Sequence, residues 1–212
     1  VQNMLKQKAV CFDTETTSLN ELEAELIGMS FSYKKGLAYY IPLSEKREEV
    51  LETLEIFRPL FEKEEILKIA HNLKFDYKVL KRYGIEVQGA IFDTMIAHYL
   101  LNPDGRHGMD YLSEIYLNYK PVSIETLIGK GKNQVTLREV SIEEQTNYAA
   151  EDADITWQLY ELFAPQLQKE NLQDLFYKVE MPLMKVLAKM ELEGVSLDKN
   201  WLAQESKDLE ND

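Results

Sequence analysis

Four short stretches of this sequence carry carboxylates, in one case together with a phenol, that could act together on a metal ion. They are Asp13-Thr14-Glu15, the segment 72–76 that ends in Asp76, Asp93-Thr94, and the segment 148–152 that runs from Tyr148 to Asp152. Each stretch taken alone is ordinary, because most acidic residues lie at a protein surface and face water. Their chemistry depends on the elements that position them.

The first two carboxylates are predicted to lie at the end of a buried strand. The segment 8–16 (KAVCFDTET) is an apolar run with β-branched and aromatic residues, which is typical of such a strand. Side chains alternate across a strand, so Asp13 and Glu15 share one side with Cys11. Two carboxylates on one side repel each other unless a cation lies between them, and Mg²⁺ is commonly held by one or two carboxylates. The alternative is a strand end with two solvated acids, which an isolated D-x-E motif favours.

Asp76 and Asp93 each follow a predicted strand. Asp76 falls in the first turn of a helix expected at 73–83, after a strand at 65–71. The helix dipole favours a negative charge there, so Asp76 alone could be an ordinary first-turn residue. Asp93 precedes the next helix, and we assign it to capping that helix rather than to chemistry.

Tyr148 and Asp152 belong to a long helix expected at 141–168. They are four residues apart and therefore lie on one face, one turn from each other. A phenol so placed could orient a water molecule beside the carboxylate; the alternative is a core tyrosine next to a solvated acid. Glu151 and Asp154 should point away from this face, because successive helical residues are rotated by about 100°.

In this order the stretches resemble a known family. FDTETTSL, HNLKFD, FDTMIAHYLL, GKGKNQVTL and YAAEDADIT closely resemble the proofreading 3′→5′ exonuclease domain of bacterial DNA polymerase I (family A), over about 8–167. The segment 180–198 is similar to the opening helix of the polymerase domain. Related exonucleases of the other branch carry a histidine where this chain has Asn147, so Tyr148 identifies the tyrosine (DEDDy) class. Ribonuclease D shares the four carboxylates and the tyrosine, but GKGKNQVTL and the tail favour the polymerase.

The resemblance implies an α/β fold with a mixed sheet flanked by helices, of the ribonuclease H-like (DnaQ-like exonuclease) class, and the order of the predicted elements agrees. Strands are expected at 8–16, 25–33, 36–43, 65–71 and 89–93, and helices at 47–63, 73–83, 95–102, 108–117, 123–128, 141–168 and 172–193. We expect an exonuclease domain at 1–170 and a helical stub at 171–212, the start of a polymerase domain. The stub's apolar stripe should stay partly exposed and self-associate weakly.

The resemblance also implies roles for the site residues. Two divalent cations, Mg²⁺ with Mn²⁺ as a substitute, would clamp the scissile phosphate. Asp13 would bridge both ions, Glu15 and Asp152 would hold the first, and Asp76 would serve the second, partly through water. Tyr148 and Glu15 would orient the attacking water, and a nucleoside monophosphate would leave the DNA 3′ end.

Further residues match family positions that contact the substrate. Leu19 would wedge between the terminal bases, although a core leucine is the alternative. The residues that would contact terminal nucleotides or their phosphates are Thr16, Asn72, Lys74 and Arg106. Ile124 stands where the family often has an aromatic residue, so base stacking should be weaker there. The loop 129–133 is a surface loop by default, and contact with DNA phosphates is the sharper alternative.

Composition restricts the partners. The chain has 24 basic and 37 acidic residues, a net charge of −13, which argues against a tight grip on duplex DNA. A nuclease that holds a few terminal nucleotides through metal ions fits this charge. The partners that the resemblance implies are a single-stranded or frayed DNA 3′ end and the rest of a polymerase polypeptide. No stretch of about twenty apolar residues and no signal-peptide core occur, so we expect no membrane partner and a cytoplasmic protein. The resemblance implies a bacterial, nucleoid-associated protein.

Other potentially reactive side chains are assigned to structure. Cys11 is the single cysteine and has no evident base, so a buried structural thiol is expected. His71 and His98 are expected in packing or surface roles, because an oxygen-ligated site does not need them. An inactive scaffold domain would lack the metal carboxylates, whereas all four are present with the tyrosine. A single-strand binding module would show basic stripes with interleaved aromatic residues, which this sequence lacks.

Overall fold

The computed structural model of the protein describes residues 1–131 and 134–211, and a five-stranded mixed sheet lies at its centre. The strands are β1 (Ala9–Thr16), β2 (Leu26–Lys34), β3 (Leu37–Pro42), β4 (Leu67–Ala70) and β5 (Ile91–Asp93), in the order β3-β2-β1-β4-β5. β1 pairs antiparallel with β2 and parallel with β4, which confirms the mixed sheet predicted from the sequence. Lys132 and Asn133 of the predicted loop 129–133, and Asp212 at the end of the predicted stub, lie outside the described residues.

Helices occupy most of the remaining chain. They are η1 (Met4–Lys6), α1 (Arg47–Glu62), α2 (Leu73–Arg82), α3 (Thr94–Leu101), α4 (Met109–Leu112), η2 (Ser113–Leu117), α5 (Ile124–Ile128), η4 (Leu137–Glu139), α6 (Ile142–Lys169), α7 (Gln173–Leu175), η5 (Phe176–Glu180), α8 (Met181–Glu193) and α9 (Lys199–Asn211). The helix predicted at 172–193 forms as α7, η5 and α8 in succession, with one π-helical turn in the middle. α9 lies within the helical stub predicted at 171–212, although its bounds were not among the predicted helices.

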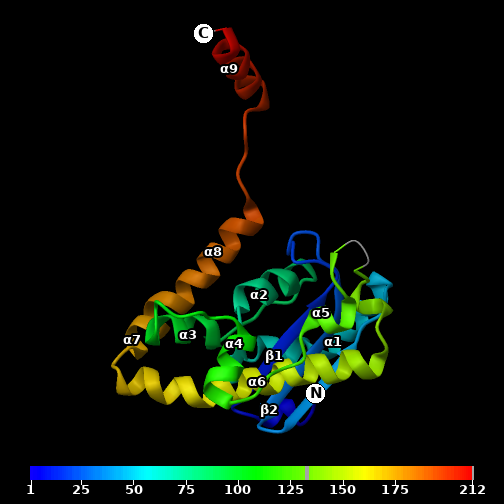
Figure 1. Ribbon diagram of the computed structural model, residues 1–212, viewed down its shortest axis with the longest axis vertical. Coiled ribbons are helices and arrows are strands. Elements are labelled where there is room, and N and C mark those ends of the chain that lie inside the picture. Colours follow the sequence, from blue (N-terminus) through cyan, green and yellow to red (C-terminus); the bar gives the residue numbers. More distant parts are fainter. Residues whose placement is uncertain (132–133, 212) are drawn as a thin grey trace.

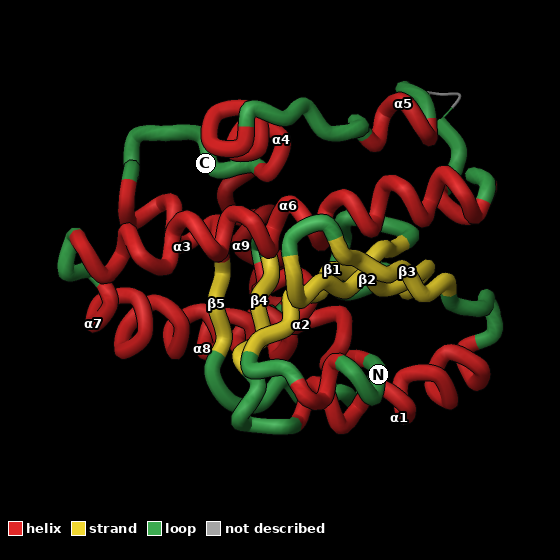
Figure 2. The backbone as a smooth tube through the Cα atoms, turned by 90° about the horizontal axis from the view of Figure 1, so that it is seen from below, coloured by secondary structure: helices red, strands yellow, loops and turns green. Residues whose placement is uncertain are grey.

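The sheet separates two helical layers. Figure 2 shows α6 on one side of the sheet and α1 and α2 on the other. The period of β1 explains this arrangement, because Phe12 points away from Cys11 and Asp13. Phe12 packs against Phe61 of α1 with ring centroids 5.2 Å apart, so α1 covers the face opposite the carboxylates. The face that carries Asp13 and Glu15 is therefore the one that α6 crosses.

The C-terminal helices lead away from the sheet. α8 packs against α2, and Figure 1 shows α9 extending beyond the rest of the molecule. Within the described part of the chain, no helix has the length and apolar character needed to cross a bilayer.

Cys11 and His98 are fully buried, as structural roles require. Burial raises the pKa of the Cys11 thiol well above its ordinary value. His98 lies 2.7 Å from His107 and 3.1 Å from the Tyr116 hydroxyl, measured between polar atoms. These contacts account for both ring nitrogens of His98 without a metal ion.

Candidate metal centre

Three carboxylates converge between β1 and α6. Each of Asp13, Glu15 and Asp152 offers an oxygen, and these oxygens lie within 4.8 Å of one another. Glu15 Oε1 is buried and has no hydrogen-bond partner among the described residues. A buried carboxylate oxygen without a donor is costly unless a cation binds it. The donor set is all oxygen, so the arrangement fits a hard divalent cation such as Mg²⁺ or Mn²⁺.

The electrostatics of this cluster favour a positive charge at its centre. Burial raises the pKa of Asp13, Glu15 and Asp152 well above their ordinary values. Mutual repulsion adds to burial: Asp13 acts on both Glu15 and Asp152. In the absence of a cation, the three carboxyl groups therefore keep protons at pH values at which ordinary carboxyl groups are ionised. A divalent cation would displace those protons, because carboxylates bind metal in their ionised form.

Asp76 lies beside the three-carboxylate cluster rather than within it. Its Oδ1 accepts hydrogen bonds from the Thr14 nitrogen at 3.1 Å and the Thr14 hydroxyl at 2.5 Å. Burial raises the pKa of Asp76 to about 7, although these hydrogen bonds oppose the shift. After burial, the charge of Asp76 is the largest cause of the raised pKa of Asp13. The negative charges of Asp76 and Asp13 therefore repel each other.

Asp93 caps two helices, as the sequence predicted for one of them. Its carboxylate accepts hydrogen bonds from the backbone of Met95 and Ile96 in α3, at 2.8 and 3.2 Å. It also accepts hydrogen bonds from the backbone of Asn72 and Leu73, at 3.2 and 2.8 Å, where α2 begins. With its acceptors used in this way, Asp93 holds α2, and Asp76 with it, in place.

Tyr148 lies one turn before Asp152 on α6 and is half-buried. Burial raises the pKa of the Tyr148 phenol, and the negative charges of Asp152 and Glu15 raise it further. The phenol therefore stays protonated, and it hydrogen-bonds the Asp152 carboxylate. A neutral hydroxyl at this point can orient a water molecule but cannot serve as a base.

The neighbouring acids of α6 point elsewhere, as predicted. The Glu151 carboxylate accepts hydrogen bonds from the Tyr119 hydroxyl and, at 2.7 Å, from the backbone of Val122. Asp154 accepts a hydrogen bond from the backbone of Gly36 at 2.6 Å. Both carboxylates therefore hydrogen-bond surface segments that pack against α6.

A cavity of about 790 Å³ opens above the carboxylates. Thr16, Leu19 and Ile124 line it together with Asp13, Glu15, Tyr148 and Asp152. Leu19 is 91% exposed, so the alternative of a core leucine is wrong. An exposed leucine at the rim of a polar cavity is available to a ligand.

Three other predicted substrate contacts lie away from this cavity. Asn72 and Lys74 line a separate cavity of about 210 Å³ against α8. The Lys74 ammonium pairs with Glu191 of α8 at 2.5 Å. Arg106 is exposed on the segment between α3 and α4. The structure therefore brings Thr16, Leu19 and Ile124 together with the carboxylates, and does not bring these three there.

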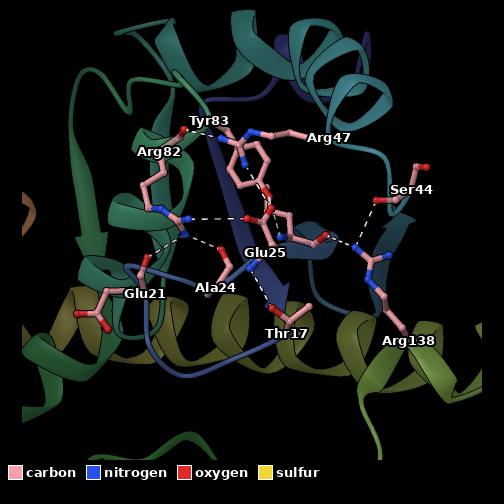
Figure 3. Close-up of polar contacts among 10 residues, drawn as sticks. Thr17, Glu21, Ala24, Glu25, Ser44, Arg47, Arg82, Tyr83 and Arg138 are labelled. Carbon is pink, nitrogen blue, oxygen red and sulfur yellow. Dashed lines mark hydrogen bonds and ion pairs between the residues drawn. The ribbon is translucent and has the colours of Figure 1, made fainter.

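The loop 17–25 carries Leu19, and no sequence pattern indicated which contacts hold this loop in place. Thr17 and Glu25 close its base through hydrogen bonds of 2.9 and 3.0 Å. Arg82, at the end of α2, donates to the carbonyl oxygens of Ala24 at 2.6 Å and Glu21 at 3.2 Å (Figure 3). These residues are far apart in the sequence, so no local pattern could reveal the contacts. Thr14 was missed as well, although its place inside the D-T-E motif was a signal.

Several known proteins are similar to this chain in sequence or in fold. A family model described as 3′-5′ exonuclease matches residues 1–168. DNA polymerase I of Borreliella burgdorferi is 39% identical over 205 residues, which are 95% of this chain and 22% of that protein. The chain thus spans about a fifth of the length of that relative.

Two solved structures share the fold. NrnC of Brucella melitensis has a TM-score of 0.74 at 23% identity, over 91% of this chain and 88% of that one. The POL domain of Pol1 from M. smegmatis has a TM-score of 0.79 at 18% identity, over 99% of this chain and 33% of that one. The α/β, ribonuclease H-like fold class predicted from the sequence is confirmed.

Proposed function

Because the chain belongs to the 3′→5′ exonuclease family found in DNA polymerase I and its homologues, we propose that it releases nucleoside monophosphates from DNA 3′ ends as the proofreading part of a family A polymerase. The convergence of Asp13, Glu15 and Asp152 around a buried, unpartnered Glu15 oxygen carries this proposal. Such a site binds a positive charge that comes from a cation and not from the protein itself. The exonuclease domain would be 1–170 and the helical stub 171–212.

The proposed cofactors are two divalent cations, Mg²⁺ or Mn²⁺. Asp13 would contact both, Glu15 and Asp152 would hold the first, and Asp76 would serve the second. When bound, the ions would lower the pKa of a water molecule and stabilise the charge on the phosphate and the departing oxygen. One structure of the similarly folded NrnC is described with bound Mg²⁺, which supports this choice.

The side chains of this chain then position the reactants. The Tyr148 hydroxyl and the free Glu15 oxygen orient the attacking water in line with the scissile bond. Tyr148 keeps its proton throughout, because its pKa is raised by burial and by Asp152. A strong protein base is not required.

Substrate binding is proposed to centre on the last nucleotides of an unpaired strand. Leu19 at the rim would part the terminal bases, Thr16 would contact the terminal nucleotide, and Ile124 would pack on a base. Asn72, Lys74 and Arg106 would contact phosphates further along, and Lys74 would first have to leave Glu191. We propose a cytoplasmic setting close to the nucleoid and the rest of a polymerase polypeptide as the further partner.

The decisive experiment uses a 3′-labelled single strand with and without Mg²⁺. Asp13→Ala should lower release of the labelled nucleotide at least about 10³-fold, because electrostatic stabilisation through metal is the main catalytic contribution. Glu143→Ala on the exposed start of α6 is the control and should match the wild type. Metal-independent release, or wild-type release by Asp13→Ala, would reject the proposal.

A second candidate is release of nucleotides from RNA. The fold similarity to NrnC, one of whose structures is described as bound to pGG, supports this second candidate. DNA and RNA strands of one sequence, compared at equal Mg²⁺, separate the candidates. We expect kcat/KM to be higher for DNA.

A further inference from the structure

Lys78 of α2 is a buried cation shared by two carboxylates from distant segments. Its side chain is 3% exposed, and its ammonium pairs with Glu21 of the loop 17–25 and with Glu191 of α8. Figure 1 shows α2 lying between α8 and the loop that follows β1. A buried ammonium is stable only while it is paired, so these two partners fix its position.

The contact with Glu21 lies two residues from Leu19. The base of the same loop is already fixed by the Thr17–Glu25 hydrogen bonds and by Arg82 (Figure 3). The Leu19 side chain itself is almost fully exposed and so receives little support from packing. The side-chain hydrogen bonds of Thr16, Ser18 and Asn20 lie nearer to the tip but stay within the loop and the end of β1. The ion pair between Lys78 and Glu21 instead ties the loop to α2, two residues from Leu19.

Lys78 and Asp76 lie on different faces of α2 and therefore have different partners. Asp76 lies two residues earlier, about 200° around the helix, and bonds to Thr14. Lys74 and Lys78 lie on one face, four residues apart, and both pair with Glu191. Glu191 therefore forms one ion pair with Lys78 from α8. The second ion pair of Lys78, with Glu21, connects α2 to the loop 17–25.

We propose that Lys78 is a positioning residue that acts through Glu21 to hold Leu19 at the mouth of the cleavage cavity. The consequence is selective: the pair governs how the enzyme opens paired ends and leaves the metal chemistry unchanged. The proposal rests on the proposed exonuclease function for its effect on activity. Its structural part, the restraint of the loop, can be measured without any activity.

Glu21→Gln is the informative variant, because Lys78 keeps Glu191 as a partner and no buried charge is left alone. Glu23→Gln is the matched control: the same change in the same loop, at a carboxylate with no ion pair among the described residues. Hydrogen exchange should become about tenfold faster over 17–25 in Glu21→Gln and in Lys78→Met, and should stay at the wild-type rate in Glu23→Gln.

Three substrates give the second measurement: a recessed paired 3′ end, a single strand, and thymidine 5′-(4-nitrophenyl phosphate), which has no second base for Leu19 to part. Glu21→Gln should lower kcat/KM on the paired end about tenfold and leave the other two substrates within about twofold, and Leu19→Ala should lower kcat/KM on the paired end at least as much. The double variant should have the same kcat/KM on the paired end as Leu19→Ala alone, because both changes remove the same function, a Leu19 side chain held at the cavity mouth.

Unchanged exchange over 17–25 in Glu21→Gln would overturn the inference. An equal loss on all three substrates with a lowered Tm would also overturn it, because that pattern indicates a general structural role. A wild-type protein that releases no nucleotide from single strands would reject the proposed function instead, and the exchange measurement would still decide whether Lys78 restrains the loop.

Discussion

Thr14 donates two hydrogen bonds to one oxygen of Asp76, from its backbone nitrogen at 3.1 Å and from its hydroxyl at 2.5 Å. Thr14 lies between Asp13 and Glu15 in β1, so one strand supplies two carboxylates and also fixes a third, which comes from α2. The hydrogen bonds lower the pKa of Asp76 against the burial that raises it to about 7. Thr14 therefore helps Asp76 to be ionised at neutral pH.

Thr14→Val should weaken metal activation. Valine keeps the branched shape but loses the hydroxyl, so the pKa of Asp76 should rise and protons should compete better with Mg²⁺. We expect the Mg²⁺ concentration for half-maximal activity to rise about tenfold at pH 7 and much less at pH 9. Mg²⁺ titrations at both pH values measure this, with Thr53→Val on α1 as the control. An equal increase at both pH values would contradict the explanation.

Tyr148→Phe should lower kcat without affecting metal binding. The change removes one hydrogen bond to the attacking water but no metal ligand, which corresponds to a loss of about 10–100-fold, or about 1.4–2.7 kcal/mol. Single-turnover rates give the loss, and Mg²⁺ titration gives the metal affinity. A loss of metal affinity as complete as in Asp13→Ala would show that Tyr148 does not act by orienting water.

The metal-free protein should become less stable as the pH rises through neutrality. The pKa of Asp76 is raised from 3.8 to about 7 in the folded state, so the folded protein binds more protons than the unfolded chain between these values. The stability from this group is fully present below pH 3.8 and lost as the pH rises through about 7. Thermal melts in chelator at pH 5.5 and pH 8 test the direction. Mg²⁺ at tenfold excess over its Kd should restore about 1.4 kcal/mol at pH 8.

Asp152→Asn should stabilise the metal-free protein at pH 8 and abolish activity. The carboxylates of Asp13 and Glu15 repel that of Asp152, and an amide removes this repulsion at similar size. We expect a Tm several degrees above that of the wild type in chelator, and no further rise on addition of Mg²⁺. A destabilised variant with a normal metal-induced shift would mean that these carboxylates do not share a site.

Local periodicity accounts for the parts of the site that could be predicted. The alternation of β1 placed Asp13 and Glu15 on one side, and the helical repeat of α6 placed Tyr148 beside Asp152. Capping chemistry assigned Asp93 correctly. Each of these relations joins residues within a single element or at its end, where sequence spacing fixes geometry.

Contacts between distant elements could not be read from the sequence. The Thr14–Asp76 contact depends on how α2 packs on β1, and Lys74 pairs with Glu191 only because α8 lies beside α2. Residue types alone also could not decide whether Leu19 is core or rim, since a leucine is common in both places. Long-range packing, rather than chemistry, limited the prediction.

The exposed stripe of α8 and η5 should cause weak self-association. Its members are Val179, Leu183, Val186, Leu187 and Met190, with exposed fractions of 49%, 43%, 51%, 39% and 63%. Apolar side chains gathered at helical spacing bury area readily against a like surface. We expect a dimer with a Kd of about 0.1 mM, visible as a concentration-dependent mass in sedimentation equilibrium. Val186→Lys with Met190→Lys should abolish it, whereas Ile56→Lys, at an exposed site on α1, should not. A wild-type mass that stays monomeric at millimolar concentration would show that this stripe does not bind a second copy.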